Sequence, residues 1–125
     1  MEMVKFIIDG ALPGLNEYVN SCRSGYRQGA RLKRQTDDDL IWVLKSQFKG
    51  QLNGCWDMDF KWFEKDKRRD HDNIASARKF ILDAFVKCGI LPDDGWKNVG
   101  DFTDTFLVDK ERPRIEIYLH SKGVV

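Results

Sequence analysis

The segment from Cys55 to Phe63 constrains the fold most, because apolar and polar side chains alternate along it. One set of alternate positions holds Trp56, Met58, Phe60 and Trp62, and the other holds Asp57, Asp59, Lys61 and Phe63. Successive side chains of a strand point to opposite faces of a sheet. The pattern therefore predicts a strand with one face on the core, and a sheet of this kind needs helices over that face.

The first half of the chain predicts a strand, a loop and a helix. Residues 3–9 are rich in Val, Ile and Phe, which favours a strand. Residues 19–29 contain serines, glycines and arginines and predict a mobile basic loop. Residues 30–49 carry apolar side chains at helical spacing and predict one long helix with a basic first half.

The second half predicts another helix and two strands. A helix is expected to follow Asn73 and to end at Gly89, because Pro92 prevents its continuation. Residues 99–108 and 114–120 predict the last two strands, joined by a hairpin-like connection. The order predicts an α+β fold: a single small domain with one mixed β-sheet covered by two main helices. A hydrophobic content of 42% in 125 residues is enough for its core.

Charge is segregated along the chain, although the net charge is only +1. Residues 18–36 contain no acid and five cations: Arg23, Arg27, Arg31, Lys33 and Arg34. A second basic stretch runs from Lys61 to Arg69, and acids gather at residues 37–39, which we expect to face solvent. This distribution predicts a basic face on a nearly neutral protein. The alternative is that the charges only cover a solvated surface.

Other classes of protein fit poorly. The three cysteines are widely spaced, which argues against a disulfide framework or a zinc site. No signal peptide and no apolar run long enough to span a bilayer is present, so the sequence predicts a cytoplasmic protein without a membrane partner.

The candidate site is the stretch from Lys67 to Asn73, which precedes a predicted helix start. It contains the cations Lys67, Arg68 and Arg69, one histidine and two carboxylates, and the Pro92–Gly95 turn beyond the helix adds Asp93 and Asp94. Carboxylates that converge on a divalent cation, among side chains that attract phosphate, suggest metal-assisted phosphodiester chemistry. The alternative is structural: Asp72 caps the helix and Asp70 pairs with neighbouring arginines.

These residues resemble the RusA family of Holliday junction resolvases. The resemblance rests on Arg68-Arg69-Asp70-x-Asp72-Asn73, Lys79, Asp83-Ala84-Phe85-x-Lys87-x-Gly89 and Asp93-Asp94, and more weakly on residues 12–18. It implies a RusA-like domain over residues 1–125 and a Mg²⁺-dependent endodeoxyribonuclease, with Mn²⁺ as an alternative metal. Such an enzyme resolves four-way junctions by paired nicks during recombination and repair. The resemblance also implies that the protein is a homodimer that binds branched DNA, of phage or prophage origin.

The resemblance assigns roles residue by residue. Asp70, Asp72 and Asp94 match the family's metal-binding aspartates, and Lys79 matches its essential lysine. Family members place that lysine four residues after the second aspartate, where this chain has Ser76. An ion pair with Asp83 is the alternative role of Lys79.

Contacts to DNA phosphates are predicted for five cations of the two basic stretches: Lys67, Arg68, Arg69, Arg27 and Arg31. Two rival functions stay open at this point. One is a branched-DNA-binding relative that cuts poorly because its lysine is displaced. The other is a structural, partner-binding protein whose acidic turns are only helix caps.

Overall fold

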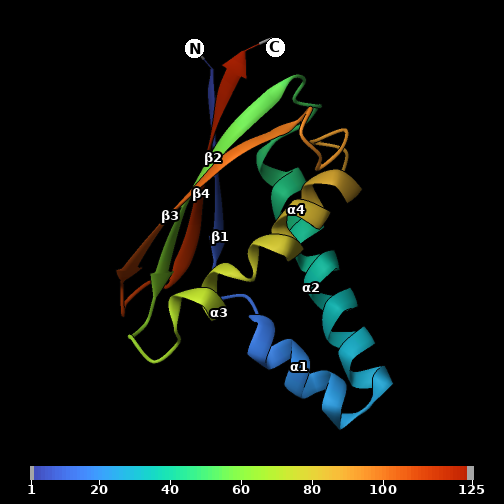
Figure 1. Ribbon diagram of the computed structural model, residues 1–125, viewed down its shortest axis with the longest axis vertical. Helices are drawn as coiled ribbons and strands as arrows, with labels where there is room; N and C mark the ends of the chain where they lie inside the picture. Colours follow the sequence, from blue (N-terminus) through green and yellow to red (C-terminus); the bar gives the residue numbers. More distant parts are fainter. Residues whose placement is uncertain (1, 124–125) are drawn as a thin grey trace.

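A computed structural model describes residues 2–123 and forms one sheet with helices beside it (Figure 1). The elements in chain order are β1 (Met3–Asp9), α1 (Leu15–Ser24), α2 (Tyr26–Gln47), β2 (Cys55–Glu64), α3 (His71–Ala75), α4 (Arg78–Lys87), β3 (Val99–Val108) and β4 (Arg114–Gly123). The predicted α+β class with a mixed sheet is confirmed.

The four-stranded sheet has the order β1-β4-β2-β3. β4 is antiparallel to both β1 and β2, whereas β2 and β3 are parallel. The predicted hairpin-like connection between the last two strands is wrong, because β2 lies between them. A parallel pair needs a crossover connection, which α3 and α4 supply between β2 and β3, and β4 then returns to the centre of the sheet.

The core lies between one face of this sheet and the helices. The four apolar side chains of β2 that alternate in the sequence are at most 1% exposed: Trp56, Met58, Phe60 and Trp62. α2 contributes Leu40 and Leu44, and α4 contributes Ile81 and Phe85, all of them buried. The Phe85 ring meets Phe6 of β1 edge-on at 5.0 Å, so α4 packs directly on the sheet. α2 and α4 are the two main helices that the sequence predicts.

The predicted mobile loop at residues 19–29 is wrong. α1 and the first turn of α2 occupy this segment and form a helical hairpin whose corner is Gly25 (Figure 1). The two helices approach closely where Gly29 faces Cys22, since a Cβ at Gly29 would lie 3.3 Å from the Cα of Cys22. The glycine that suggests a loop in the sequence therefore serves a helix–helix contact.

The single helix predicted after Asn73 is split into α3 and α4. Ser76 lies at the break, where its hydroxyl donates to the Asn73 carbonyl at 2.6 Å and accepts the Leu15 N–H at 2.7 Å. Hydroxyl groups that bond nearby backbone compete with regular helix hydrogen bonds. α4 ends before Gly89, whose φ of 81° fits the predicted C-terminal cap.

Asp37 is buried, which corrects the expectation that residues 37–39 face solvent. Only 6% of it is exposed, and its Oδ2 lies 2.6 Å from Lys87 Nζ and 3.5 Å from Lys33 Nζ. The hydrogen bond to Asp37 raises the pKa of Lys87 above its ordinary value. This ion pair joins α2 to α4 across the helical layer.

Replacing Lys87 by methionine should lower the free energy of unfolding by about 1–2 kcal/mol, because Asp37 stays buried with only Lys33 beside it. Urea unfolding of Lys87→Met measures this, with Lys45→Met on exposed α2 surface as the control. Because the pKa of Lys87 is raised in the folded state, its charge stabilises the fold below the unfolded pKa of 10.5. The stability difference between the wild type and Lys87→Met should therefore shrink above that pH. Equal stability of both variants would contradict a structural role for the pair.

No helix of the described chain covers the opposite face of the sheet (Figure 1). This face carries a charged network. Glu116 accepts hydrogen bonds from the Tyr118 hydroxyl at 2.6 Å and from Arg114 Nε at 2.7 Å. The bond from Tyr118 lowers the pKa of Glu116, and the bond from Arg114 and the charge of Lys5 act in the same direction against burial. Such a carboxylate stabilises the fold above its unfolded pKa and loses that contribution as the pH falls through the folded value.

We therefore expect the free energy of unfolding to decline as the pH falls below the unfolded Glu pKa of 4.5. Tyr118→Phe should make this decline shallower, because Glu116 then titrates closer to its unfolded value. Urea unfolding at several acidic pH values tests the expectation, with Tyr26→Phe as the control on an exposed ring. An unchanged decline in Tyr118→Phe would show that the hydrogen bond from Tyr118 to Glu116 does not contribute to the acid sensitivity.

Two further observations bear on protein class. Cys22, Cys55 and Cys88 are all free thiols. None of the helices within residues 2–123 is long and apolar enough to cross a membrane.

Candidate functional site

Asp70 and Asp72 present open carboxylates at the start of α3. Asp70 occupies the N-cap position but makes no capping hydrogen bond, and Asp72 lies in the first helical turn. Both residues are exposed. Neither side chain has an ion pair or hydrogen bond within the described part of the chain. The pairing of Asp70 with neighbouring arginines is therefore not formed, and both carboxylates are accessible to an external ligand.

The side chain of Asn73 holds the start of α3 in place by hydrogen bonds to α1. It is buried, its Oδ1 accepts the Asn16 N–H at 2.9 Å, and its Nδ2 donates to Glu17 Oε2 at 3.1 Å. Together with the bond between Leu15 and Ser76, these contacts attach the first turn of α1 to α3. The motif asparagine therefore positions the neighbouring acids through the backbone.

Arg69 is engaged inside the protein. Its guanidinium lies 3.1 Å from Glu17 and 3.2 Å from Glu64, and it donates to the Leu12 carbonyl at 3.2 Å. Burial raises the pKa of Glu17, but hydrogen bonds from backbone and Asn73 and the charge of Arg69 outweigh it, and the net shift is downward. Arg69, which the sequence analysis predicts to contact a DNA phosphate, thus instead links β2, α1 and the segment before α3.

Arg69→Met should cost about 2 kcal/mol of folding free energy, because Glu64 and Glu17 lose a partly buried cationic partner. Thermal or urea unfolding measures the loss, with the exposed neighbour Arg68→Met as the control. A loss no larger than that of the control would show that Arg69 is available for an external partner.

The remaining basic residues of the motif face solvent. The side chain of Arg68 is 87% exposed and lies 3.6 Å from Asp66, and Lys67 is exposed without an ion pair in the described residues. A cavity of about 500 Å³ lies beside Lys67 and is also lined by Glu64, Asp70, His71 and Phe106. The His71 ring stacks on Phe106 of β3 at 3.9 Å. Lys67 and the largely exposed Arg68, which pairs only with Asp66 among the described residues, are thus accessible to a phosphate.

Lys79 meets two carboxylates. Its Nζ lies 3.0 Å from Asp83 Oδ1 and 3.8 Å from Asp94 Oδ2. The hydrogen bond to Asp83 raises the pKa of Lys79, and the charges of Asp83 and Asp94 add to this effect. Both carboxylates therefore favour the protonated form of the Lys79 side chain. The structure thus brings Lys79 close to Asp94. It also shows the ion pair between Lys79 and Asp83, which is the alternative role predicted for Lys79.

The donor set suits a hard divalent cation in its chemistry but is not assembled into one group within residues 2–123. Asp70, Asp72 and Asp94 supply carboxylate oxygens, which Mg²⁺ prefers, and all three are exposed. Among residues 2–123, however, no three His, Cys, Asp or Glu side chains form a group that could hold a metal ion. Mg²⁺ is commonly held by one or two carboxylates with water and substrate phosphate completing its shell. The residues thus fit a site that substrate completes.

Several residues of this region escape sequence reasoning. Glu17 and Glu64 hold Arg69, although they are distant from it and from each other in the sequence. Asp104 of β3 accepts from Trp62 Nε1 at 2.8 Å and pairs with Arg78 at the start of α4. Asp104 pairs with Phe60 of β2, so the alternation of β3 places it on the face of the sheet that the helices cover. A polar residue at such a position indicates a buried partner and could have been recognised in the sequence.

Comparison with known proteins leaves the family open. No family model matches the chain, and no curated protein matches it. The resemblance to the RusA family stays a prediction that rests on the residues of the motif.

Proposed function

We propose that this protein is a Mg²⁺-dependent, structure-specific endodeoxyribonuclease of RusA type that nicks four-way DNA junctions, with Mn²⁺ as an alternative metal. One observation carries the proposal: Asp70 and Asp72 are exposed and unpartnered in the described chain, on a helix start held by buried Asn73. Two unpaired carboxylates near the exposed cations Lys67 and Arg68 suit a metal ion and a phosphate together.

The chain's own residues have separate tasks in this proposal. Asp70 and Asp72 would hold the ion, and Asp94 from the turn before β3 would be a third carboxylate ligand. When bound, the ion supplies Lewis-acid polarisation of the phosphate and a more acidic water. Lys79, protonated beside Asp94, contacts a phosphate oxygen, and Arg68 and Lys67 bind the neighbouring backbone. Exchange of Asp83 for phosphate as the partner of Lys79 accompanies substrate binding.

The substrate also bears on assembly and location. A four-way junction needs two cuts related by symmetry, and a homodimer provides two identical sites. We therefore include a homodimer in the proposal, acting on DNA in the cytoplasm of a bacterial host cell.

A second candidate is a branched-DNA-binding relative that cuts poorly. Two observations favour it. The three aspartates do not form one group, and the partner of Lys79 at 3.0 Å is Asp83 and not a catalytic acid.

The test is incubation of the protein with a labelled synthetic four-way junction, and with linear duplex of the same sequence, in Mg²⁺, Mn²⁺ or EDTA. Paired nicks in the junction alone, dependent on metal, are the expected result. Tight binding of the junction without nicks in either metal would support the second candidate. Neither binding nor cleavage would overturn both and favour a partner-binding protein whose acidic turns are structural.

A further inference from the structure

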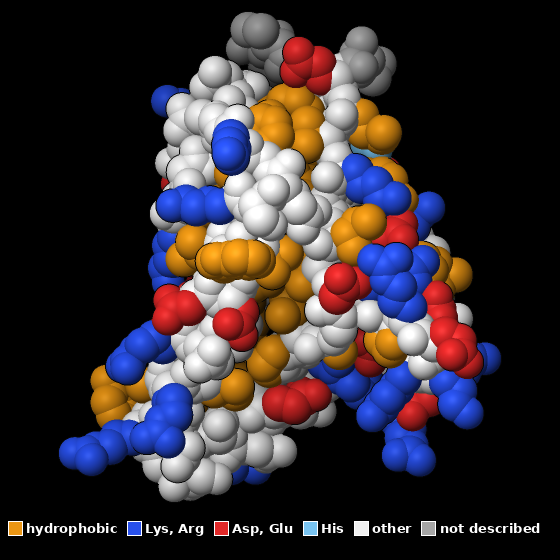
Figure 2. All heavy atoms as spheres, turned by 180° about the vertical axis from the view of Figure 1, so that it is seen from behind, with side chains coloured by type: hydrophobic (Ala, Val, Ile, Leu, Met, Phe, Trp, Pro, Cys, Tyr) orange, Lys and Arg blue, Asp and Glu red, His pale blue; other side chains and the backbone are white. Residues whose placement is uncertain are grey.

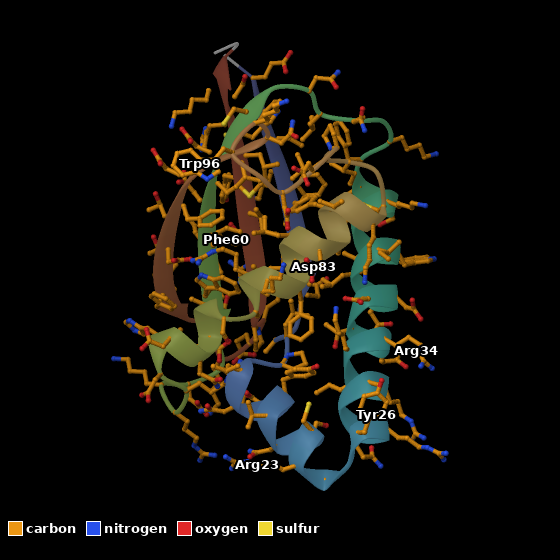
Figure 3. All side chains as sticks on the ribbon, turned by 45° about the vertical axis from the view of Figure 1, so that its right-hand side comes forward. Arg23, Tyr26, Arg34, Phe60, Asp83 and Trp96 are labelled. Atoms are coloured by element: carbon orange, nitrogen blue, oxygen red, sulfur yellow. The ribbon has the colours of Figure 1, made fainter. Side chains whose placement is uncertain are left out.

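The α1–α2 hairpin extends away from the sheet and ends far from β2 (Figure 1). Figure 3 shows Arg23, Tyr26 and Arg34 on this hairpin, with side chains directed away from the body. No residue of α1 is buried, so the outer part of the hairpin contributes little to the core. The outer part of the α1–α2 hairpin is therefore a candidate binding element.

Three arginines form a stripe along the outer part of α2. Arg27, Arg31 and Arg34 are spaced i, i+4 and i+7, which places them on one helix face. They and Arg23 are exposed and have no ion pair within residues 2–123. Figure 2 shows Lys and Arg side chains projecting at the lower left, over the end of the hairpin. The stripe spans about 10 Å, or about three base-pair steps of DNA, and its uncompensated charge suits consecutive phosphates.

Tyr26 lies at the corner of the hairpin and is 89% exposed. It starts α2 next to Arg27, and no ring contact, cation–π contact or hydrogen bond of its side chain is formed in the described chain. An exposed aromatic ring beside cations is the arrangement with which proteins bind unpaired bases, because every base offers a flat π face. Bases within a continuous duplex are already stacked, whereas an unpaired or branch-point base leaves its stack at lower cost.

The hairpin has a fixed position relative to the acids. Its first turn is bonded to Asn73 and Ser76 of the α3 region, and the α1–α2 crossing is close at Gly29. The Tyr18 ring of α1 also meets Phe80 of α4 at 6.1 Å. DNA held at the tip is therefore placed at a set distance from Asp70 and Asp72.

We infer that the α1–α2 hairpin is a DNA-gripping arm that selects branched or unpaired DNA. The Arg27, Arg31 and Arg34 stripe binds the phosphates of one strand, and Tyr26 stacks on a base that has left the duplex. In this arrangement the arginines provide affinity for any DNA, and Tyr26 provides the preference for branched or unpaired DNA over continuous duplex. This inference rests on the proposed function, because it takes DNA as the ligand.

The first experiment measures binding in EDTA, so that cleavage does not interfere, as a function of salt. The triple variant R27Q/R31Q/R34Q should bind a four-way junction about tenfold or more weakly, with a log–log salt slope shallower by about 3. The control is K45Q/K49Q/K110Q, which removes equal charge from exposed lysines elsewhere. Its slope should change by less than about 1. Circular dichroism checks that both variants keep their helices.

Two failures are distinguishable here. If the wild-type protein shows no salt-sensitive DNA binding, the proposed function and this inference fall together. If it binds, but the arginine variant weakens no more than the lysine control, the arm is wrong and the proposed function stands.

The second experiment compares junction and overhang-bearing duplex with blunt linear duplex. Tyr26→Ala should reduce the preference for the first two by about 5- to 100-fold, whereas Tyr26→Phe keeps the ring and should retain it within about twofold. Unchanged preference in Tyr26→Ala, or an equal loss in Tyr26→Phe, would overturn stacking by Tyr26.

Discussion

Asp72→Asn is expected to reduce metal-dependent nicking of a four-way junction by about 1,000-fold or more while leaving junction binding in EDTA nearly unchanged. The amide is neutral and a weaker ligand for a hard cation than the carboxylate it replaces. Asp72 is exposed and unpartnered in the described chain, so its loss should affect few contacts within the fold. Its stabilising effect on the first turn of α3 is worth about 0.3–1 kcal/mol at most.

The measurement is the initial nicking rate under single-turnover conditions, with urea unfolding alongside it. Asp38→Asn is the matched control, since Asp38 is an exposed acid on α2 with no ion pair in residues 2–123. A nicking rate near wild type in Asp72→Asn would return the acids of the motif to a structural role. A rate loss that followed an equal loss of stability would point to misfolding and not to chemistry.

Gly14→Ala is expected to lower the free energy of unfolding by about 3 kcal/mol or more, which corresponds to about 10 °C in Tm for a chain of this size. A Cβ at this position would lie within 3.0 Å of both oxygens of Asn73 and of a guanidinium nitrogen of Arg69. One of these atoms is a backbone oxygen, which cannot rotate aside as a flexible side chain does. Relief requires α1 to separate from α3, which breaks the bonds of Asn73 to Asn16 and Glu17.

Gly89→Ala is the matched control for this prediction. It makes the same chemical change at a φ of 81° with nothing within 4 Å, so it should cost only about 1 kcal/mol. If Gly14→Ala is no less stable than Gly89→Ala, α1 and α3 are not in the close contact described above. Because the same contact holds the start of α3, Gly14→Ala should also slow nicking in any fraction that stays folded.

Some features of the motif follow from short stretches of sequence, and others do not. The positions of Asp70 and Asp72 at a helix start, the end of α4 near Gly89 and the strand from Cys55 follow from short-range rules of capping and alternation. Arg69 could not be assigned in this way. Its partners Glu17 and Glu64 come from separate elements, so its neutralisation depends on how those elements pack.

The residues at 19–29 show the opposite case. Serines and glycines favour a loop locally, yet the segment is helical because Gly29 allows α1 and α2 to cross closely and the α1 root is bonded to Asn73 and Ser76. Tertiary contacts of this kind outweigh propensities of less than about 1 kcal/mol per residue.

The sequence by itself determined the class of fold, the covered face of β2 and the acids at the start of α3, because periodicity and capping act over a few residues. Only the tertiary structure decided that β4 lies between β1 and β2, that Asp37 is buried with Lys87, and that Asp94 comes within 3.8 Å of Lys79. Each of these depends on pairing between segments distant in the chain. Such pairing is selected by the packing of the whole core and leaves no short pattern in the sequence.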